Sequence, residues 1–153
     1  MNTSENLSIL IILYEEDFTL ISKCLENLKN FKVIIIDNAG NKILRDKIEL
    51  KFKIFKYIVN KKNLGFPGAA NQGIMLCDTE YLFILGADCL MSHQDIENLF
   101  IAKKKYKDCL IVSPTFYTPN GNLSYNGGML PENGGKNKIL PLEGDTCVEA
   151  ILT

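Results

Sequence analysis

Leu7-Ser8-Ile9-Leu10-Ile11-Ile12-Leu13 and Val33-Ile34-Ile35-Ile36 are two short, nearly continuous apolar runs near the start of a 153-residue chain. Runs of this length without polar alternation predict strands that are covered on both faces, as in a parallel sheet. The segment between them has apolar residues at helical spacing, and Asp17 is placed to cap that helix. The two runs therefore predict the first strand-helix-strand unit of an α/β sheet.

The same alternation continues along the chain. Further strands are expected at residues 55–59, 81–85 and 110–112. Further helices are expected at residues 42–50, at residues 69–76 with Pro67 in the first turn, and after Ser92, which with Asp95 resembles a capping box. Alternating strands and helices predict a three-layer α/β domain with a mainly parallel sheet flanked by helices.

The character of the sequence changes from Pro114 onward, where glycine and proline become frequent. The pair Asn120-Gly121 predicts a hairpin turn, and residues 147–153 predict the start of another strand. We therefore expect an α/β domain over residues 1–115, followed by a Gly/Pro-rich hairpin and loop region over residues 116–153.

The composition is that of an ordered globular chain, because 46% of the residues are hydrophobic and 23% are charged. The net charge is -1 with both signs scattered along the chain, so nucleic acid is not an expected partner. Lys103-Lys104-Lys105 with Lys107 falls in an expected helix. We interpret it as a solvated helix face rather than as a patch that binds phosphate or membrane.

The cysteines and the N-terminus bear on the cellular compartment. The chain has 5 cysteines without a C-x-x-C pair, which predicts reduced thiols rather than disulfides. His93 is the one histidine and cannot build a zinc site by itself. The apolar run at residues 7–13 is too short to span a membrane and follows no basic region. We expect a cytoplasmic protein, with peripheral contact at the inner face of the membrane through a partner.

Polar and aromatic residues follow several of the expected strands. In open α/β sheets, ligands bind beyond the carboxyl ends of the strands. The residues there are Tyr14-Glu15, Asp37-Asn38, residues 60–68 and residues 86–88. Each has a structural explanation as a turn or cap residue, but together they predict a pocket. The first turn has no glycine, which excludes the Rossmann and P-loop motifs.

The segment at residues 63–73 makes the prediction more specific. Its sequence, Asn63-Leu64-Gly65-Phe66-Pro67-Gly68-Ala69-Ala70-Asn71-Gln72-Gly73, resembles the N-L-G-F-a-G-g-n-N-q-G segment of family-two glycosyltransferases, especially their rhamnosyltransferase-like branch. Three other segments resemble family motifs in family order: residues 11–15 (I-V-T-Y-N), 34–39 (V-V-V-D-N-a/s) and 81–88 (y-l-l-f-L-N-P-D). The resemblance implies the nucleotide-sugar-binding half of an inverting glycosyltransferase with the GT-A fold.

The resemblance implies roles in nucleotide binding for six residues. Tyr14 is expected to lie against the base, for which a flat aromatic ring is suited. Asp37 is expected to accept a hydrogen bond from the base, and Asn38 to support that turn. The other three are expected to line the sugar-nucleotide cleft: Asn63, Gly65 and, from the following helix, Asn71.

The resemblance also implies a metal. Asp88 is the surviving carboxylate of the family's D-x-D-type motif and is expected to hold Mg²⁺ or Mn²⁺ against the diphosphate. Gly86 and Ala87 replace the usual Asn and Pro, and Leu13 and Glu15 replace the usual Thr and Asn beside Tyr14.

The implied reaction transfers a sugar from a nucleotide-diphosphate sugar to a saccharide or lipid-linked acceptor hydroxyl with inversion, as in cell-surface polysaccharide synthesis. No segment matches the family's acceptor half with its catalytic base, so the catalytic residues are unknown and the chain is expected to be incomplete for the reaction. The alternative is a non-catalytic nucleotide-sugar-binding module that acts with a partner chain or by self-association. A nucleotidyltransferase would need a glycine-rich basic loop where Glu15-Glu16 stands.

Overall fold

The computed structural model describes residues 3–106 and 110–125. The chain divides into two compact units, Met1–His93 and Gln94–Thr153. The expected domain boundary after residue 115 stays a prediction.

The first unit is built on a parallel sheet, as the apolar runs predicted. The sheet has four strands in the order β3-β2-β1-β4, and each neighbouring pair is parallel. The strands are β1 (Leu7–Leu13), β2 (Lys32–Asp37), β3 (Lys56–Val59) and β4 (Tyr81–Gly86). The central strand β1 pairs with β2 on one side and with β4 on the other, so both of its edges are hydrogen-bonded.

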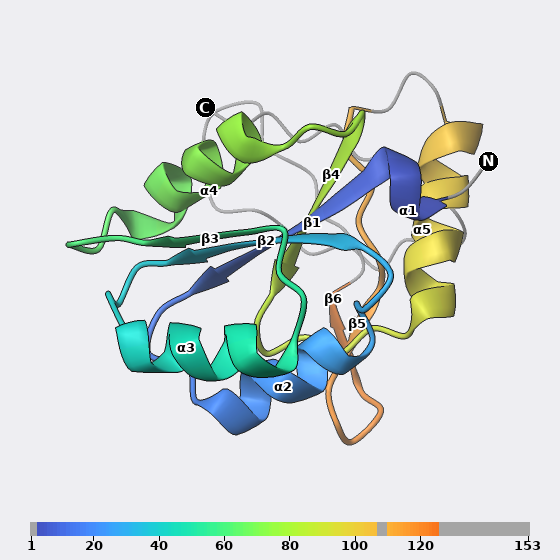
Figure 1. The fold of residues 1–153 in the computed structure, drawn as a ribbon. Coiled ribbons are helices and arrows are strands. Elements are labelled where there is room, and N and C mark those ends of the chain that lie inside the picture. The colour runs from blue at the N-terminus through green and yellow to red at the C-terminus, as the bar shows by residue number, and fades with distance from the viewer. Residues whose placement is uncertain (1–2, 107–109, 126–153) are drawn as a thin grey trace, which may run out of the picture. The chain divides into compact units, whose positions relative to one another are not determined.

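Helices cover both faces of this sheet. The helices are α1 (Thr3–Asn6), α2 (Phe18–Glu26), α3 (Lys42–Lys51) and α4 (Gly65–Leu76). Helices α2 and α3 lie on one face and α4 lies on the other (Figure 1). Asp17 caps α2 as expected, because its Oδ1 accepts a hydrogen bond from the Leu20 backbone N–H at 2.9 Å. The predicted three-layer α/β architecture is confirmed.

The core beneath α4 depends on one close approach. Leu10, Ile34, Ile36 and Ala69 form a buried cluster there. Gly73 faces this cluster, and a Cβ atom added to it would lie 2.3 Å from Leu10 Cδ2. The missing side chain therefore lets α4 lie directly against β1.

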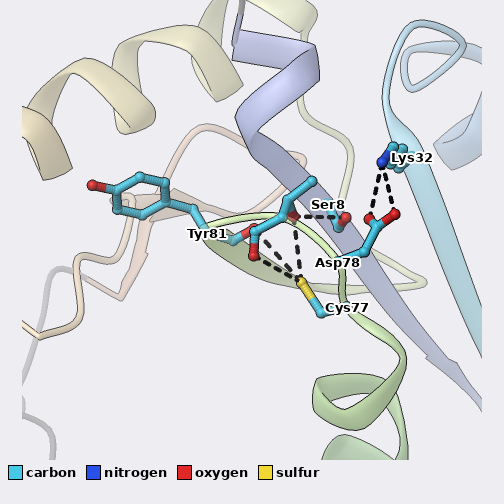
Figure 2. A network of polar contacts seen from close by, with 6 residues as sticks. Ser8, Lys32, Cys77, Asp78 and Tyr81 are labelled. Carbon is cyan, nitrogen blue, oxygen red and sulfur yellow. Dashed lines mark hydrogen bonds and ion pairs between the residues drawn. The ribbon is translucent and has the colours of Figure 1, made fainter.

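A polar network ties the segment before β4 to the amino ends of β1 and β2 (Figure 2). Thr79 Oγ1 lies 2.8 Å from the buried Ser8 Oγ, and Lys32 pairs with Asp78 at 2.9 Å. The Cys77 thiol lies 3.3 Å from Thr79 Oγ1. These contacts are at the amino end of the sheet, so they align β4 without reaching the opposite edge.

The second unit contains the predicted hairpin and lacks one predicted strand. Helix α5 runs from His93 to Lys105, and strands β5 (Phe116–Tyr117) and β6 (Leu123–Tyr125) pair antiparallel. Gly121 in their turn has a φ of 79°, which glycine adopts without strain. The prediction of a strand at residues 110–112 is wrong. Leu110 is 81% exposed, and no described strand pairs with this apolar run, which leads into Pro114.

The described cysteines are free thiols, as expected: Cys24, Cys77 and Cys89. Outside the described residues lie Cys109, Cys147, the strand expected at residues 147–153 and most of the Gly/Pro-rich region. Among the described helices, none is long and apolar enough to cross a bilayer.

The close approach of α4 to β1 predicts that Gly73→Val destabilises the chain by about 2 kcal/mol through overpacking. The loss is expected even though valine favours a helix more than glycine does. The control is Met75→Val, at a site on the same helix that is 85% exposed, which should lose about 0.5 kcal/mol or less. Urea unfolding measures both, and equal losses would contradict the proposed steric cause.

Candidate functional site

The carboxyl ends of the four parallel strands meet at one edge of the sheet. The residues that follow them are Tyr14, Asn38, Asn60 and Ala87-Asp88. The chain leaves β1 toward β2 on one side, while β4 lies on the other side. This reversal is the switch point at which open α/β sheets form their ligand crevice. Because Ile12 pairs with Gly86, Tyr14 and Asp88 each stand two residues beyond that pair, at the crevice.

Tyr14 is half exposed, at 50%, in a tight turn after β1. Its backbone N–H donates to the Glu16 carboxylate. Glu15 has a φ of 68°, which is uncommon for a residue other than glycine. The turn thus leaves the Tyr14 ring available to a ligand.

Asp37 at the end of β2 is fully buried, and its carboxylate organises its own turn. Oδ1 accepts hydrogen bonds from the backbone N–H groups of Ala39 at 2.8 Å and Gly40 at 3.0 Å. Oδ2 accepts from the Asn41 N–H at 3.0 Å. The carboxylate therefore fixes the β2–α3 turn, and its expected contact with a base stays a prediction.

Tyr57 on β3 is a buried neighbour of Asp37 that the sequence did not single out. Burial, and next the negative charge of Asp37, raise the pKa of the Tyr57 phenol, so it stays protonated. Its hydroxyl is buried without a well-formed hydrogen bond among the described residues. The Arg45 guanidinium lies 5.7 Å from the centre of the ring. Tyr57 therefore adds a buried, neutral side chain next to the Asp37 carboxylate.

Asn38 belongs to a chain of three side-chain amides. Its Oδ1 accepts from Asn60 Nδ2 at 2.9 Å, and its Nδ2 donates to the Gly65 carbonyl at 3.2 Å. Asn60 and Gln72 form a reciprocal amide pair: Asn60 Nδ2 donates to Gln72 Oε1 at 2.8 Å, and Gln72 Nε2 donates to Asn60 Oδ1 at 3.0 Å. The amide chain therefore joins the ends of β2 and β3 to helix α4.

The expected role of Asn38 as a turn support stays a prediction. Asn60 was expected only as part of the strand-end range 60–68, and Gln72 was given no role. Two signals could have found them. Asn60 is the first residue after the third strand, and Gln72 lies within the N-L-G-F segment. Their pairing across 12 positions depends on how α4 packs, which neither signal provides.

The start of α4 is a tight turn held by Asn63. Asn63 Oδ1 accepts from the Gly65 N–H at 2.7 Å, and Gly65 has a φ of 69°. The amide chain fixes Gly65 from the other side through its carbonyl. Asn71 is exposed on the same helix, and its expected place in the cleft stays a prediction. The structure thus brings Asn38, Asn63 and Gly65 together.

Asp88 is exposed just after β4. The Cys89 thiol lies 3.6 Å from Asp88 Oδ1 and donates to it. A Cβ atom on Gly86 would lie 2.7 Å from the same oxygen, so glycine leaves room for this carboxylate position. Burial, and next the charge of Asp88, raise the pKa of the Cys89 thiol, and burial raises that of Cys24 to about 11. Both thiols are therefore neutral, and Asp88 carries the negative charge here.

The fit of Asp88 to a metal can be judged from its surroundings. No cluster of three or more His, Cys, Asp or Glu side chains suited to a metal occurs among the described residues. Mg²⁺ is commonly held by one or two carboxylates together with substrate phosphates. An exposed carboxylate at the crevice fits that mode, in which the substrate supplies the other ligands.

Comparison with known proteins supports the fold and the family. Residues 8–148 match the family described as glycosyl transferase family 2. The crystal structure of S. aureus TarS has a TM-score of 0.62 at 15% identity, covering 83% of this chain and 24% of that chain. The crystal structure of S. aureus TarS 1–349 has a TM-score of 0.53, and that of its complex with UDP has a TM-score of 0.52. Both are 17% identical in sequence, and each match covers 67% of this chain and 33% of that chain. The chain thus spans a quarter to a third of those proteins. No curated protein sequence matches it.

The amide pair predicts a pH-dependent defect in Gln72→Glu. When ionised, the introduced carboxylate faces Asn60 Oδ1 and cannot donate, so its pKa in the folded state rises above the unfolded value of about 4.3. Below the unfolded pKa, the variant should have the same free energy of unfolding as the parent. As the pH rises through the folded pKa, the free energy of unfolding of the variant should fall by about 1–3 kcal/mol relative to the parent. Urea unfolding at about pH 4, below the unfolded pKa, and at about pH 7.5 measures the change.

The control for this variant is Gln94→Glu. Gln94 also bonds an asparagine amide, Asn98, at 3.1 Å, but both residues are exposed on α5. Water can replace that hydrogen bond, so the control should stay near the parent at both pH values. A pH dependence of equal size in the two variants would show that the buried pair has no special role.

Proposed function

Because the chain belongs to glycosyl transferase family 2, we propose that the carboxyl edge of its sheet binds the nucleotide of a nucleotide-diphosphate sugar. The observation that carries the proposal is the switch point between β1 and β4, where the half-exposed Tyr14 follows one strand and the exposed Asp88 follows the other. Aromatic rings suit bases, and a carboxylate suits a cation that accompanies a diphosphate.

Within this proposal, Tyr14 stacks on the base, while Asp37 and Asn38 form the turn that borders it. Asn63 and Gly65 line the sugar-nucleotide cleft at the start of α4, and Asn71 reaches it from the same helix. The short turn held by Asn63 supports this assignment, because it brings backbone rather than side chains to the edge of the cleft.

Asp88 would hold Mg²⁺ or Mn²⁺, which when bound supplies positive charge to the departing diphosphate. In the proposed reaction an acceptor hydroxyl attacks the anomeric carbon from the face opposite the diphosphate. The bond to the diphosphate breaks, and the configuration is inverted. A base that takes the hydroxyl proton is not assigned. The family motifs favour a rhamnosyltransferase-like enzyme of cell-surface polysaccharide synthesis with a saccharide or lipid-linked acceptor.

The second candidate is a non-catalytic nucleotide-sugar-binding module that acts with a partner chain. Such a module would bind the same nucleotide-sugar donor as the proposed transferase but would not transfer the sugar. The acidic residues of the Gly/Pro-rich region lie outside the described residues and none is assigned as a base: Glu132, Glu143, Asp145 and Glu149. Transfer assays with nucleotide sugars and mixed acceptors distinguish the two candidates, since a module binds the donor without transfer.

Asp88→Asn is expected to remove the metal dependence of nucleotide binding while leaving the unfolding midpoint near that of the parent. UDP is the first probe, because a TarS structure contains it, and GDP- and dTDP-sugars follow. Calorimetric titration with Mn²⁺ and with EDTA measures the effect. The matched control is Asp46→Asn, an exposed carboxylate on α3, which should keep the parent's response. Absence of nucleotide binding by the folded parent would overturn the proposed function itself.

Tyr14→Ala is expected to weaken nucleotide binding about tenfold, because base–aromatic stacking contributes about 1–3 kcal/mol per base. The ring is half exposed, so the fold should tolerate its loss. The control is Tyr117→Ala, at an exposed tyrosine of β5. The same titration measures both, and unchanged affinity in the Tyr14 variant would refute stacking by this ring.

A further inference from the structure

The basic side chains are concentrated in one part of the sequence. Residues 29–56 carry eight Lys and Arg side chains against three Asp and Glu, whereas the whole chain has 17 against 18. One of those three acids is the buried Asp37, whose charge is held by its own turn. This segment includes α3 and the loop that follows it, and it lies wholly within the first unit.

Helix α3 has apolar side chains on two sides that are about a third of a turn apart. Leu44 and Ile48 are buried against the sheet. Ile43 and Leu50 are 70% and 91% exposed. They are seven positions apart, about two helical turns, so they lie on the same side of α3. Lys47 stands between them along the helix and is also exposed. An outer face that combines two large aliphatic side chains with a cation is unusual for a helix that meets only water.

Several lysines on this side of the sheet are left without an acidic partner. Glu49 pairs with Arg45 at 2.9 Å, and Glu26 pairs with Lys51 at 3.0 Å. Asp46 adds to the charges around Arg45. Lys32 pairs with Asp78. In the described part of the chain, no ion pair engages the other five cations of this region: Lys29, Lys42, Lys47, Lys53 and Lys56.

A pocket of about 230 Å³ opens in the same region between α2 and the segment after α3. Its walls are apolar and include Leu28, Phe52 and Ile54. Lys29 and Lys53 also line it. Apolar walls with cations beside them suit a ligand that is anionic at one end and apolar at the other.

We propose that the outer face of α3, with this lysine-lined pocket, docks on the surface of an anionic phospholipid bilayer. Ile43 and Leu50 enter the boundary between headgroups and acyl chains, and Lys29, Lys47 and Lys53 contact lipid phosphates. The combination of lysines and exposed aliphatic side chains favours an anionic bilayer over an acidic protein. A bilayer offers phosphates to the lysines and acyl chains to the aliphatic side chains, and it needs no complementary surface shape. This docking does not depend on the proposed nucleotide site, so each can fail separately.

Sedimentation of the 153-residue chain with vesicles tests the proposal. The chain should bind phosphatidylcholine vesicles that contain phosphatidylglycerol and should not bind phosphatidylcholine alone. High salt should weaken binding several-fold, because it screens exposed charges. Ile43→Ser with Leu50→Ser, and separately Lys47→Gln with Lys53→Gln, should each weaken binding about tenfold.

The matched control is Met75→Ser, which also replaces a large exposed apolar residue but lies on α4, on the other face of the sheet (Figure 1). It should bind vesicles as the parent does. Absent vesicle binding, or an equal loss in the Met75 variant, would overturn the proposal. Binding to polyglutamate but not to vesicles would indicate an acidic protein partner instead. Self-association of the parent that is lost in the Ile43→Ser, Leu50→Ser variant, without vesicle binding, would indicate a second copy as the occupant instead.

Discussion

The pairing of β1 with β2 on one edge and with β4 on the other is the constraint on which the first unit depends. It makes β1 the centre of the sheet, so its side chains must be covered on both faces. Leu10 meets α4 on one of these faces, and Gly73 is the residue that permits the contact. The same pairing creates the switch point, because the chain continues from β1 to β2 on one side of β1 while β4 pairs on the other side. The crevice is therefore a consequence of how the core is closed.

The amide chain extends this order from the core to the edge of the crevice. Asn38 and Asn60 are buried polar side chains at the ends of β2 and β3, and Gln72 approaches them from α4. Buried amides are stable only when both their donors and acceptors are satisfied. Here each amide has a fixed orientation, because the Gly65 carbonyl sets the direction of Asn38 and Asn38 sets that of Asn60. The start of α4 is thus positioned by the hydrogen bond from Asn38 to the Gly65 carbonyl and by the amide pair of Asn60 and Gln72.

Much of the fold could be predicted from the sequence because strands buried on both faces are short apolar runs, and the helices between them begin at recognisable caps such as Asp17. The failure at residues 110–112 has a physical cause: an apolar run becomes a strand only when a neighbour supplies hydrogen bonds, and Leu110 is exposed instead. The candidate site residues were predicted from the strand ends and from the family motifs, and their roles stay predictions. The side-chain partners could not be predicted, since the reciprocal pair of Asn60 and Gln72 exists only once α4 has docked.

The charges along the carboxyl edge bear on how a diphosphate could be accommodated. Glu15 and Glu16 follow β1, and Asp88 follows β4, so the crevice between these strands is acidic. Lys61 and Lys62 follow β3, which is separated from β1 by β2. The thiols of Cys24 and Cys89 are neutral because of burial and therefore add no charge. A diphosphate at the crevice would thus face these carboxylates, while the described lysines at this edge of the first unit follow the more distant strand β3, and repulsion would oppose binding. A divalent cation on Asp88 reverses the sign of that interaction, which is the physical reason to expect nucleotide binding and metal binding to be coupled at this edge.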